Sequence, residues 1–155
     1  TVQAVVVTTD AVRCGNGSAP WQQHTTKERN KMMKDCSGLV IGRSSRLTNF
    51  LEYQDFKLVF KRYASLYFVT GVTKDENELN ILEVMHHFVE LLDRYFGNVC
   101  ELDIIFNFHA AYFLLDEIII GGHIQETSKK AILKKISQQD LLLDEQFFKD
   151  EEKKK

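Results

Sequence analysis

NFLEYQDFKLVFKRYASLYFVTGV, residues 49–72, is rich in aromatic and β-branched side chains. Apolar residues alternate with others in two runs, at Phe56, Leu58 and Phe60 and then at Leu66, Phe68, Thr70 and Val72. A period of two places alternate side chains on the same face of a strand. The segment therefore predicts two or three antiparallel strands.

The chain before this sheet predicts a strand, a turn and a helix. The short β-branched run QAVVV, residues 3–7, favours a strand, and Pro20 lies in a glycine-rich turn region. Thr25 is followed three residues later by Glu28, a capping-box pattern that satisfies two backbone amides at a helix start. We expect the first helix to span roughly Thr26–Ile41.

The chain after the sheet predicts a second helix. Asp75 and Glu78 repeat the capping-box spacing, and Gly97 supplies a stop signal. The apolar residues between them recur at helical spacing, so one stripe should pack against the sheet. This stripe consists of Leu82, Met85, Val89, Leu92 and Phe96.

Residues 101–120 predict a third helix that is apolar on nearly every side and ends at Gly121 and Gly122. Its polar interruptions, among them Asn107 and Asp116, argue against a membrane span, which needs ~20 mostly apolar residues. Such a helix is covered by its own domain or by a partner subunit. Residues 126–146 predict a last amphipathic helix. We expect one domain over residues 1–145 and a charged, solvated, mobile tail over residues 146–155.

Composition limits the classes of function. The chain has 20 basic and 22 acidic residues, a formal net charge of -2, so it lacks the broad positive field that attracts nucleic acid. Its three widely spaced cysteines suit a reducing compartment better than a disulfide framework. The first ten residues lack the basic segment and the long apolar run of a secretory signal. These features favour a cytosolic protein.

The reactive side chains do not form a catalytic or metal-binding pattern. The carboxylates next to Cys100 would raise the thiol pKa, which disfavours a nucleophile. His86 and His87 are adjacent on a helix and point about 100° apart, so they cannot share a metal as an i, i+4 pair would. The spacing of His109 and His123 matches no zinc pattern. We expect no enzymatic activity, metal or cofactor, and the sequence has none of the common phosphate-binding or hydrolase motifs.

Three stretches of the chain resemble a known family. FKLVFKRYASLYF, NELNILEVMHHFVELLDRYFGNVCELDIIFNFHAAYFLLDEIIIGG and IQETSKK closely resemble the sigma, or small, subunit of clathrin adaptor protein complexes. The similarity runs from about Glu28 to Lys130. Within the family, KRYASLYF, DENEL and LDRYFGNVCELDIIFNF look most like the sigma chain of the trans-Golgi and endosomal adaptor complex.

The resemblance implies an α+β, longin-like fold, in which helices pack on both faces of an antiparallel sheet of about five strands. It implies a non-enzymatic subunit of a heterotetramer, held by the trunk of a large gamma-type adaptin beside beta and mu chains. The complex would be cytoplasmic and peripheral on membranes of the trans-Golgi network, endosomes and clathrin-coated vesicles. The chain would contact the membrane through the complex.

In this family the sigma chain also binds acidic dileucine sorting signals, [DE]xxxL[LI], in cargo tails. The resemblance assigns that role to Ala64 and Leu66 on a strand, to Val89 and Leu92 on the second helix, and to Asn98, Val99 and Ile104 around the turn into the third helix. The alternative for each residue is an ordinary place in the core.

The amino end departs from the family pattern. Relatives begin with a strand in which a basic residue helps to receive the acidic position of the signal, whereas here only Trp21 matches convincingly and Arg13 does not align with that residue. The resemblance therefore implies that leucine capture survives while acidic selectivity weakens. A purely architectural small chain, with its cargo site closed, is the alternative.

Overall fold

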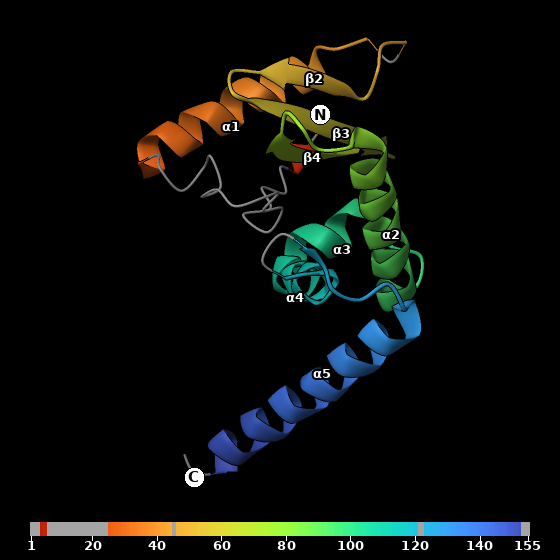
Figure 1. The fold of residues 1–155 in the computed structure, drawn as a ribbon. Coiled ribbons are helices and arrows are strands. Elements are labelled where there is room, and N and C mark those ends of the chain that lie inside the picture. Colours follow the sequence, from red (N-terminus) through yellow and green to blue (C-terminus); the bar gives the residue numbers. More distant parts are fainter. Residues whose placement is uncertain (1–3, 6–24, 45, 121–122, 153–155) are drawn as a thin grey trace.

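The computed structural model describes residues 4–5, 25–44, 46–120 and 123–152 (Figure 1). Strands and helices of this part follow one another in a mixed order. They are β1 (Ala4–Val5), α1 (Thr26–Ile41), β2 (Phe50–Tyr53), β3 (Phe56–Tyr63), β4 (Leu66–Thr73), α2 (Glu78–Phe96), α3 (Glu101–Phe106), α4 (Phe108–Ile118), β5 (Ile119–Ile120), β6 (His123–Ile124) and α5 (Lys129–Glu152).

The main sheet has the strand order β1-β4-β3-β2. The pairs β2–β3 and β3–β4 are antiparallel, with Phe60 opposite Val69, which confirms the antiparallel strands predicted over residues 49–72. Among the described residues, the sheets differ from the expected antiparallel sheet of about five strands in two respects. First, β1 lies parallel to β4, with Ala4 opposite Tyr67; a parallel pair needs a long crossover, which α1 and two strands provide here. Second, β5 and β6 form a separate two-stranded ribbon.

Helices cover both faces of the main sheet, as expected (Figure 1). On one face, α1 contributes Met32, Cys36 and Val40 to a cluster with alternate residues of β3, namely Phe56, Leu58 and Phe60. On the other face, side chains of β3 and β4 pack with α2, α3, α4 and α5 in a larger cluster. The alternation within β3 therefore divides its side chains between two cores.

The start of α1 follows the predicted capping box. Thr25 Oγ1 accepts a hydrogen bond from the Glu28 amide at 3.4 Å, and the Glu28 carboxylate accepts one from the Thr25 amide at 2.8 Å. Two amides that have no partner inside the helix are thus satisfied locally.

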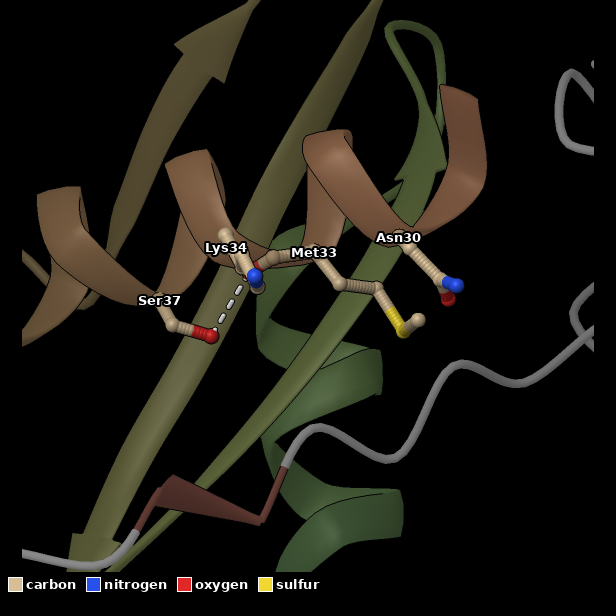
Figure 2. A pocket seen from close by; sticks show the side chains of 4 residues that line it. All are labelled: Asn30, Met33, Lys34 and Ser37. Carbon is tan, nitrogen blue, oxygen red and sulfur yellow. Dashed lines mark hydrogen bonds between the residues drawn. The ribbon is translucent and has the colours of Figure 1, made fainter. Parts of the chain in front are cut away.

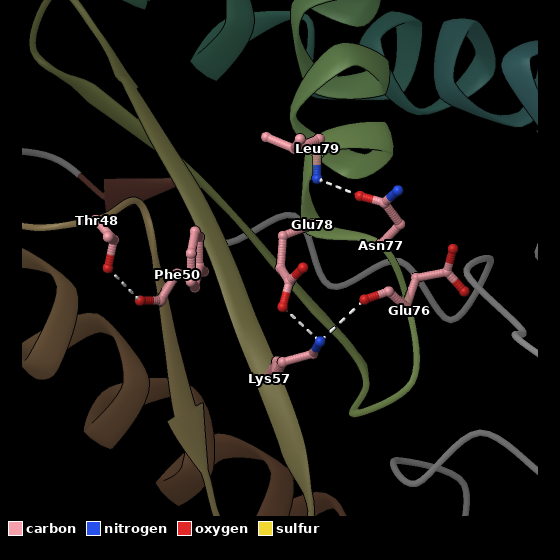
Figure 3. Close-up of polar contacts among 7 residues, drawn as sticks. All are labelled: Thr48, Phe50, Lys57, Glu76, Asn77, Glu78 and Leu79. Atoms are coloured by element: carbon pink, nitrogen blue, oxygen red, sulfur yellow. Dashed lines mark hydrogen bonds and ion pairs between the residues drawn. The ribbon is translucent and has the colours of Figure 1, made fainter.

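The start of α2 differs from the prediction, because Asn77 and not Asp75 caps the helix. Asn77 Oδ1 accepts from the Leu79 amide at 3.0 Å. Lys57, on β3, bonds both the Glu76 carbonyl, at 2.9 Å, and the Glu78 carboxylate (Figure 3). The hydrogen bond from Lys57 lowers the pKa of Glu78. This ion pair joins the helix start to the sheet and places the cap two residues later than expected.

The predicted third helix is divided at Asn107 into α3 and α4. Asn107 has φ −116° and ψ 40°, and its side-chain amide donates to the Asp103 carbonyl at 3.0 Å. An asparagine side chain that bonds a nearby carbonyl competes with regular helix geometry. The helix also ends at Ile118, because the β-branched pair Ile119–Ile120 forms β5.

The last helix, α5, is longer than predicted and continues through Glu152. Ile132 and Ile136 anchor its first half in the larger cluster, and the Tyr95 hydroxyl donates to Asp140 at 2.9 Å. Beyond these contacts α5 leads away from the rest of the structure (Figure 1). The segment expected to be a mobile tail is thus helical as far as the structure describes it. None of the helices in the described ranges has both the length and the apolar character needed to span a membrane.

Candidate functional site

The chain reverses direction between α2 and α3. Gly97 and Asn98 both adopt left-handed backbone angles, with φ of 66° and 65°. Glycine has no steric penalty in this region and asparagine tolerates it, so Gly97 ends α2 as predicted. Asp93 holds the turn, since its carbonyl accepts from the Gly97 amide at 2.9 Å and its carboxylate accepts from the Val99 amide at 3.1 Å.

A hydrogen-bonded contact joins the start of α3 to the turn between β3 and β4. The Glu101 carboxylate accepts from the Ser65 amide at 3.1 Å and from the Ser65 hydroxyl at 2.6 Å. The hydroxyl bond is the main cause that lowers the pKa of Glu101. Ala64, which was expected on a strand, lies instead in this turn, with φ 51° and an exposed side chain. A tight hairpin turn requires positive φ values, which strand residues do not adopt.

Five of the seven predicted cargo-binding residues belong to one apolar cluster. Leu66, Leu92 and Ile104 are 3%, 0% and 7% exposed members of the larger core cluster, and Val89 and Val99 are half-buried and pack against that cluster. We call these five residues the α2–α3 cluster. The remaining two, Ala64 and Asn98, have exposed side chains in the turns beside it. These five residues are part of the general core of the chain, and Leu92 is fully buried in it.

The sequence analysis missed the polar residues that hold this region together. Ser65, Asp93 and Glu101 make the bonds described above, and the Tyr63 hydroxyl lies 3.3 Å from His86 Nδ1, with the two rings nearly parallel. A carboxylate in the first turn of a helix is a recognisable signal for Glu101. Its partner Ser65 is 36 residues away, and no local pattern identifies such a pair.

In the part of the chain that the structure describes, the reactive-looking side chains do not assemble into a catalytic group. Cys100 is exposed, and its amide donates to the Asp103 carboxylate at 2.8 Å, a bond that lowers the pKa of Asp103. Burial raises the pKa of the Cys36 thiol to about 11, which keeps it protonated. His109 is exposed and packs edge-to-face with Phe108. Within the described ranges, no three His, Cys, Asp or Glu side chains lie close enough to hold a metal ion.

Helices α3 and α4 carry a large exposed apolar surface. Phe106 and Phe108, on either side of the break at Asn107, are 74% and 60% exposed. Further exposed side chains extend this surface along both helices. We call the whole set the α3–α4 surface, and it consists of Leu102, Ile105, Phe106, Phe108, Tyr112 and Phe113. Exposed apolar side chains gathered on two adjoining helices favour a contact with another protein.

A separate hollow of about 460 Å³ lies along α1 (Figure 2). Its lining residues Asn30, Met33, Lys34 and Ser37 come from successive turns of that helix, and Ser37 Oγ donates to the Met33 carbonyl at 2.7 Å. Three of the four are polar, and α1 covers the face of the sheet opposite the α2–α3 cluster. The hollow is therefore unrelated to leucine binding.

Comparison with known proteins identifies the family. A family model for the clathrin adaptor complex small chain matches residues 19–143. The AP-1 complex subunit sigma-2 of Dictyostelium discoideum is 58% identical over 120 residues, which cover 77% of this chain and 78% of that protein. The AP-1 complex subunit sigma-1A of Homo sapiens is 56% identical over 119 residues, which cover 77% and 75%.

Structural similarity agrees with the sequence matches. A chain in a homology model of the full-length AP-3 complex, in a stretched open conformation, matches with a TM-score of 0.61 and 28% identity. The match covers 81% of this chain and 86% of that chain. These matches confirm the resemblance seen in the sequence: the chain belongs to the clathrin adaptor complex small-chain family, whose members are non-enzymatic subunits, and AP-1 sigma subunits are among its close relatives.

Proposed function

We propose that this chain is the small subunit of an AP-1-type clathrin adaptor heterotetramer with a longin-like fold. Its family and its AP-1 sigma relatives support this assignment. In the complex it packs against the trunk of a large gamma-type chain, beside beta and mu chains. The complex serves vesicle transport between the trans-Golgi network and endosomes, as a peripheral coat on their membranes.

The α3–α4 surface is the best candidate for the contact with the large chain. Phe106 and Phe108 of this surface are each more than half exposed, which is costly in water and favourable in an interface. The sequence predicted that an apolar third helix is covered either by its own domain or by a partner subunit, and in α3 and α4 the described residues leave these side chains exposed.

We further propose that the α2–α3 cluster binds the leucines of acidic dileucine signals. The observation that supports this proposal is that five of the seven predicted residues belong to the larger core cluster or pack against it, with Val89 and Val99 only half-buried. Three elements that are distant in the sequence meet there: the start of β4, the second half of α2 and the turn into α3.

The energetics favour recognition of leucine over recognition of the acidic position. Burying a leucine side chain contributes ~1.5–3 kcal/mol, whereas an exposed ion pair contributes ~0–1 kcal/mol. Asp93 and Glu101, which border the α2–α3 cluster, are both acidic and do not attract a carboxylate. The ordering of the peptide offsets part of the leucine term, so a single site binds weakly, and several sites on one membrane compensate.

A second candidate function is purely architectural. It is favoured by the low exposure of Leu66, Leu92 and Ile104, because the chain's own side chains fill the centre of the cluster. In this case the chain stabilises the coat and leaves cargo binding to other subunits.

The test is a titration of a fluorescent peptide with an ExxxLL signal into this chain co-expressed with its gamma-type trunk. A peptide with both leucines changed to serine is the control, and Val99→Asp supplies a matched protein variant at the cluster surface. Binding that requires both the leucines and Val99 supports the cargo function. Intact assembly without leucine-dependent binding leaves the architectural function.

A further inference from the structure

Positive charge is concentrated in α1 and the turn that follows it. Residues 25–47 contain six basic and two acidic side chains, a local net charge of +4, whereas the whole chain has a net charge of -2. The other residues together therefore carry -6. Such segregation creates a local positive potential on a protein that is acidic overall.

Three of these lysines lie on one face of α1. Lys27, Lys31 and Lys34 are exposed, and their i, i+4 and i+7 spacing aligns them on the side opposite the buried residues Met32 and Cys36. We call these three lysines the α1 lysine stripe. The arrangement leaves their ammonium groups pointing to solvent while the inner side of the helix packs on the sheet.

The two acidic residues of α1 offset only part of the positive charge of residues 25–47, which keep a net charge of +4. The Glu28 carboxylate is bound at the helix cap by Thr25. Asp35 faces Tyr53 on β2, where burial, together with the nearby Cys36 and Asp35, raises the pKa of the tyrosine. Among the residues that the structure describes, no salt bridge involves a lysine of the stripe.

Exposed apolar side chains lie at the carboxyl end of α1 and in the turn that follows it. Ile41 falls on the same side of α1 as Lys34 and is 40% exposed, and Leu47 in the following turn is 54% exposed. Arg46, beside Leu47, is also exposed. Lysines on flexible stems next to exposed aliphatic groups suit a surface that is anionic outside and apolar beneath.

The α1 lysine stripe and the α3–α4 surface belong to opposite faces of the sheet (Figure 1). A large chain that covers the α3–α4 surface therefore does not need to cover α1. The two surfaces can be occupied at the same time.

We propose that the outer face of α1 docks directly on an anionic membrane, with Lys27, Lys31 and Lys34 on lipid phosphates and Ile41 and Leu47 at the boundary with the acyl chains. This contact is additional to the membrane attachment of the complex as a whole. It needs no cargo peptide. It weakens as salt is added, because exposed charges are screened.

The test uses the chain co-expressed with its gamma-type trunk and flotation with two kinds of vesicle. One kind contains phosphatidylcholine alone, and the other contains added phosphatidylserine. The stripe variant is Lys27→Glu/Lys31→Glu/Lys34→Glu. The control variant, Lys74→Glu/Lys130→Glu/Lys134→Glu, makes the same change in net charge at exposed lysines outside α1.

The stripe variant should bind phosphatidylserine vesicles at least about tenfold less well than the control variant, since each lysine near an anionic surface contributes a several-fold increase in binding. Both variants should behave alike on neutral vesicles. Equal binding of the two variants to phosphatidylserine overturns the proposal. The proposal is also overturned if the stripe variant still binds the vesicles but no longer binds an acidic protein partner. A Lys→Gln version of the stripe, which should give a smaller loss in the same direction, replaces the Glu version if that variant does not assemble.

Discussion

Replacing Phe106 and Phe108 with serine should prevent assembly with the large chain and at the same time make the isolated chain more soluble. The two rings are 74% and 60% exposed. With 150–250 Å² per aromatic side chain, together they present about 270 Å², or about 7 kcal/mol if fully buried. Association offsets part of this sum, so we expect a loss of about 3 kcal/mol or more, which is a more than 100-fold weaker complex.

The assay is co-purification of the small chain with its gamma-type trunk, followed by light scattering of the small chain alone. Leu79→Ser is the matched control, because Leu79 is 70% exposed but lies at the start of α2, outside the α3–α4 surface. The control should assemble normally. Normal assembly of the Phe106→Ser/Phe108→Ser variant would refute the assignment of this surface to the large chain.

Three further outcomes follow from burial and protonation. Leu92→Ala should destabilise the chain by ~2–5 kcal/mol because Leu92 is fully buried, whereas Val99→Ala, at a half-buried site, should cost only about 1 kcal/mol of stability but should weaken binding of the leucine peptide more. Urea unfolding measures the stability and peptide titration measures the binding. The reverse order of effects would contradict the burial of Leu92 and the half-buried position of Val99. Burial lowers the pKa of His87, so the unfolded chain binds this proton more tightly than the folded chain, and the free energy of unfolding should fall as pH drops below about 6.5. His87→Leu should make the free energy of unfolding depend less on pH in this range. An unchanged pH dependence would contradict the lowered pKa of His87. Cys36, with its pKa raised to about 11, should react with an alkylating probe at neutral pH far more slowly than exposed Cys100. Peptide mass spectrometry measures the two rates, and equal rates would contradict the burial of Cys36.

Local patterns predicted the elements that local interactions determine. The capping box of Thr25 and Glu28 and the stop at Gly97 each depend on residues a few positions apart, and both are confirmed. The second cap was misplaced because Asp75 and Asn77 are both suitable capping residues, and the distant Lys57 fixes which turn begins the helix. Periodicity also could not show the break at Asn107, which results from one side-chain hydrogen bond.

The candidate site shows a similar division. Family resemblance predicted seven cargo-binding residues, and five of them belong to the larger core cluster or pack against it. The resemblance could not show which hydrogen bonds join the start of α3 to the turn between β3 and β4, because Ser65 and Glu101 meet only after the sheet and α3 have packed. The parallel pairing of β1 with β4 is likewise a long-range feature that no spacing within residues 3–7 reveals.

The bond between Ser65 and Glu101 can distinguish two ways in which a leucine peptide binds at the α2–α3 cluster. Since Leu66, Leu92 and Ile104 fill the centre of the α2–α3 cluster, peptide leucines must either rest on Val89 and Val99 or push the start of α3 away from the hairpin. Separation would break the bond that holds the pKa of Glu101 below its usual range, so that pKa should rise on peptide binding, as it should in Ser65→Ala without peptide. NMR titration of the Glu101 carboxyl group measures both changes.

The depressed pKa of Glu101 stabilises the folded chain above the unfolded-state pKa, and this contribution is lost as pH falls through the lower folded value. If a peptide binds through its leucines and the Glu101 pKa does not change, the peptide rests on the closed α2–α3 cluster. If the Glu101 pKa rises on binding, the peptide has moved the start of α3 away from the hairpin. If Ser65→Ala leaves the pKa unchanged, the hydroxyl is not its cause and this reasoning fails.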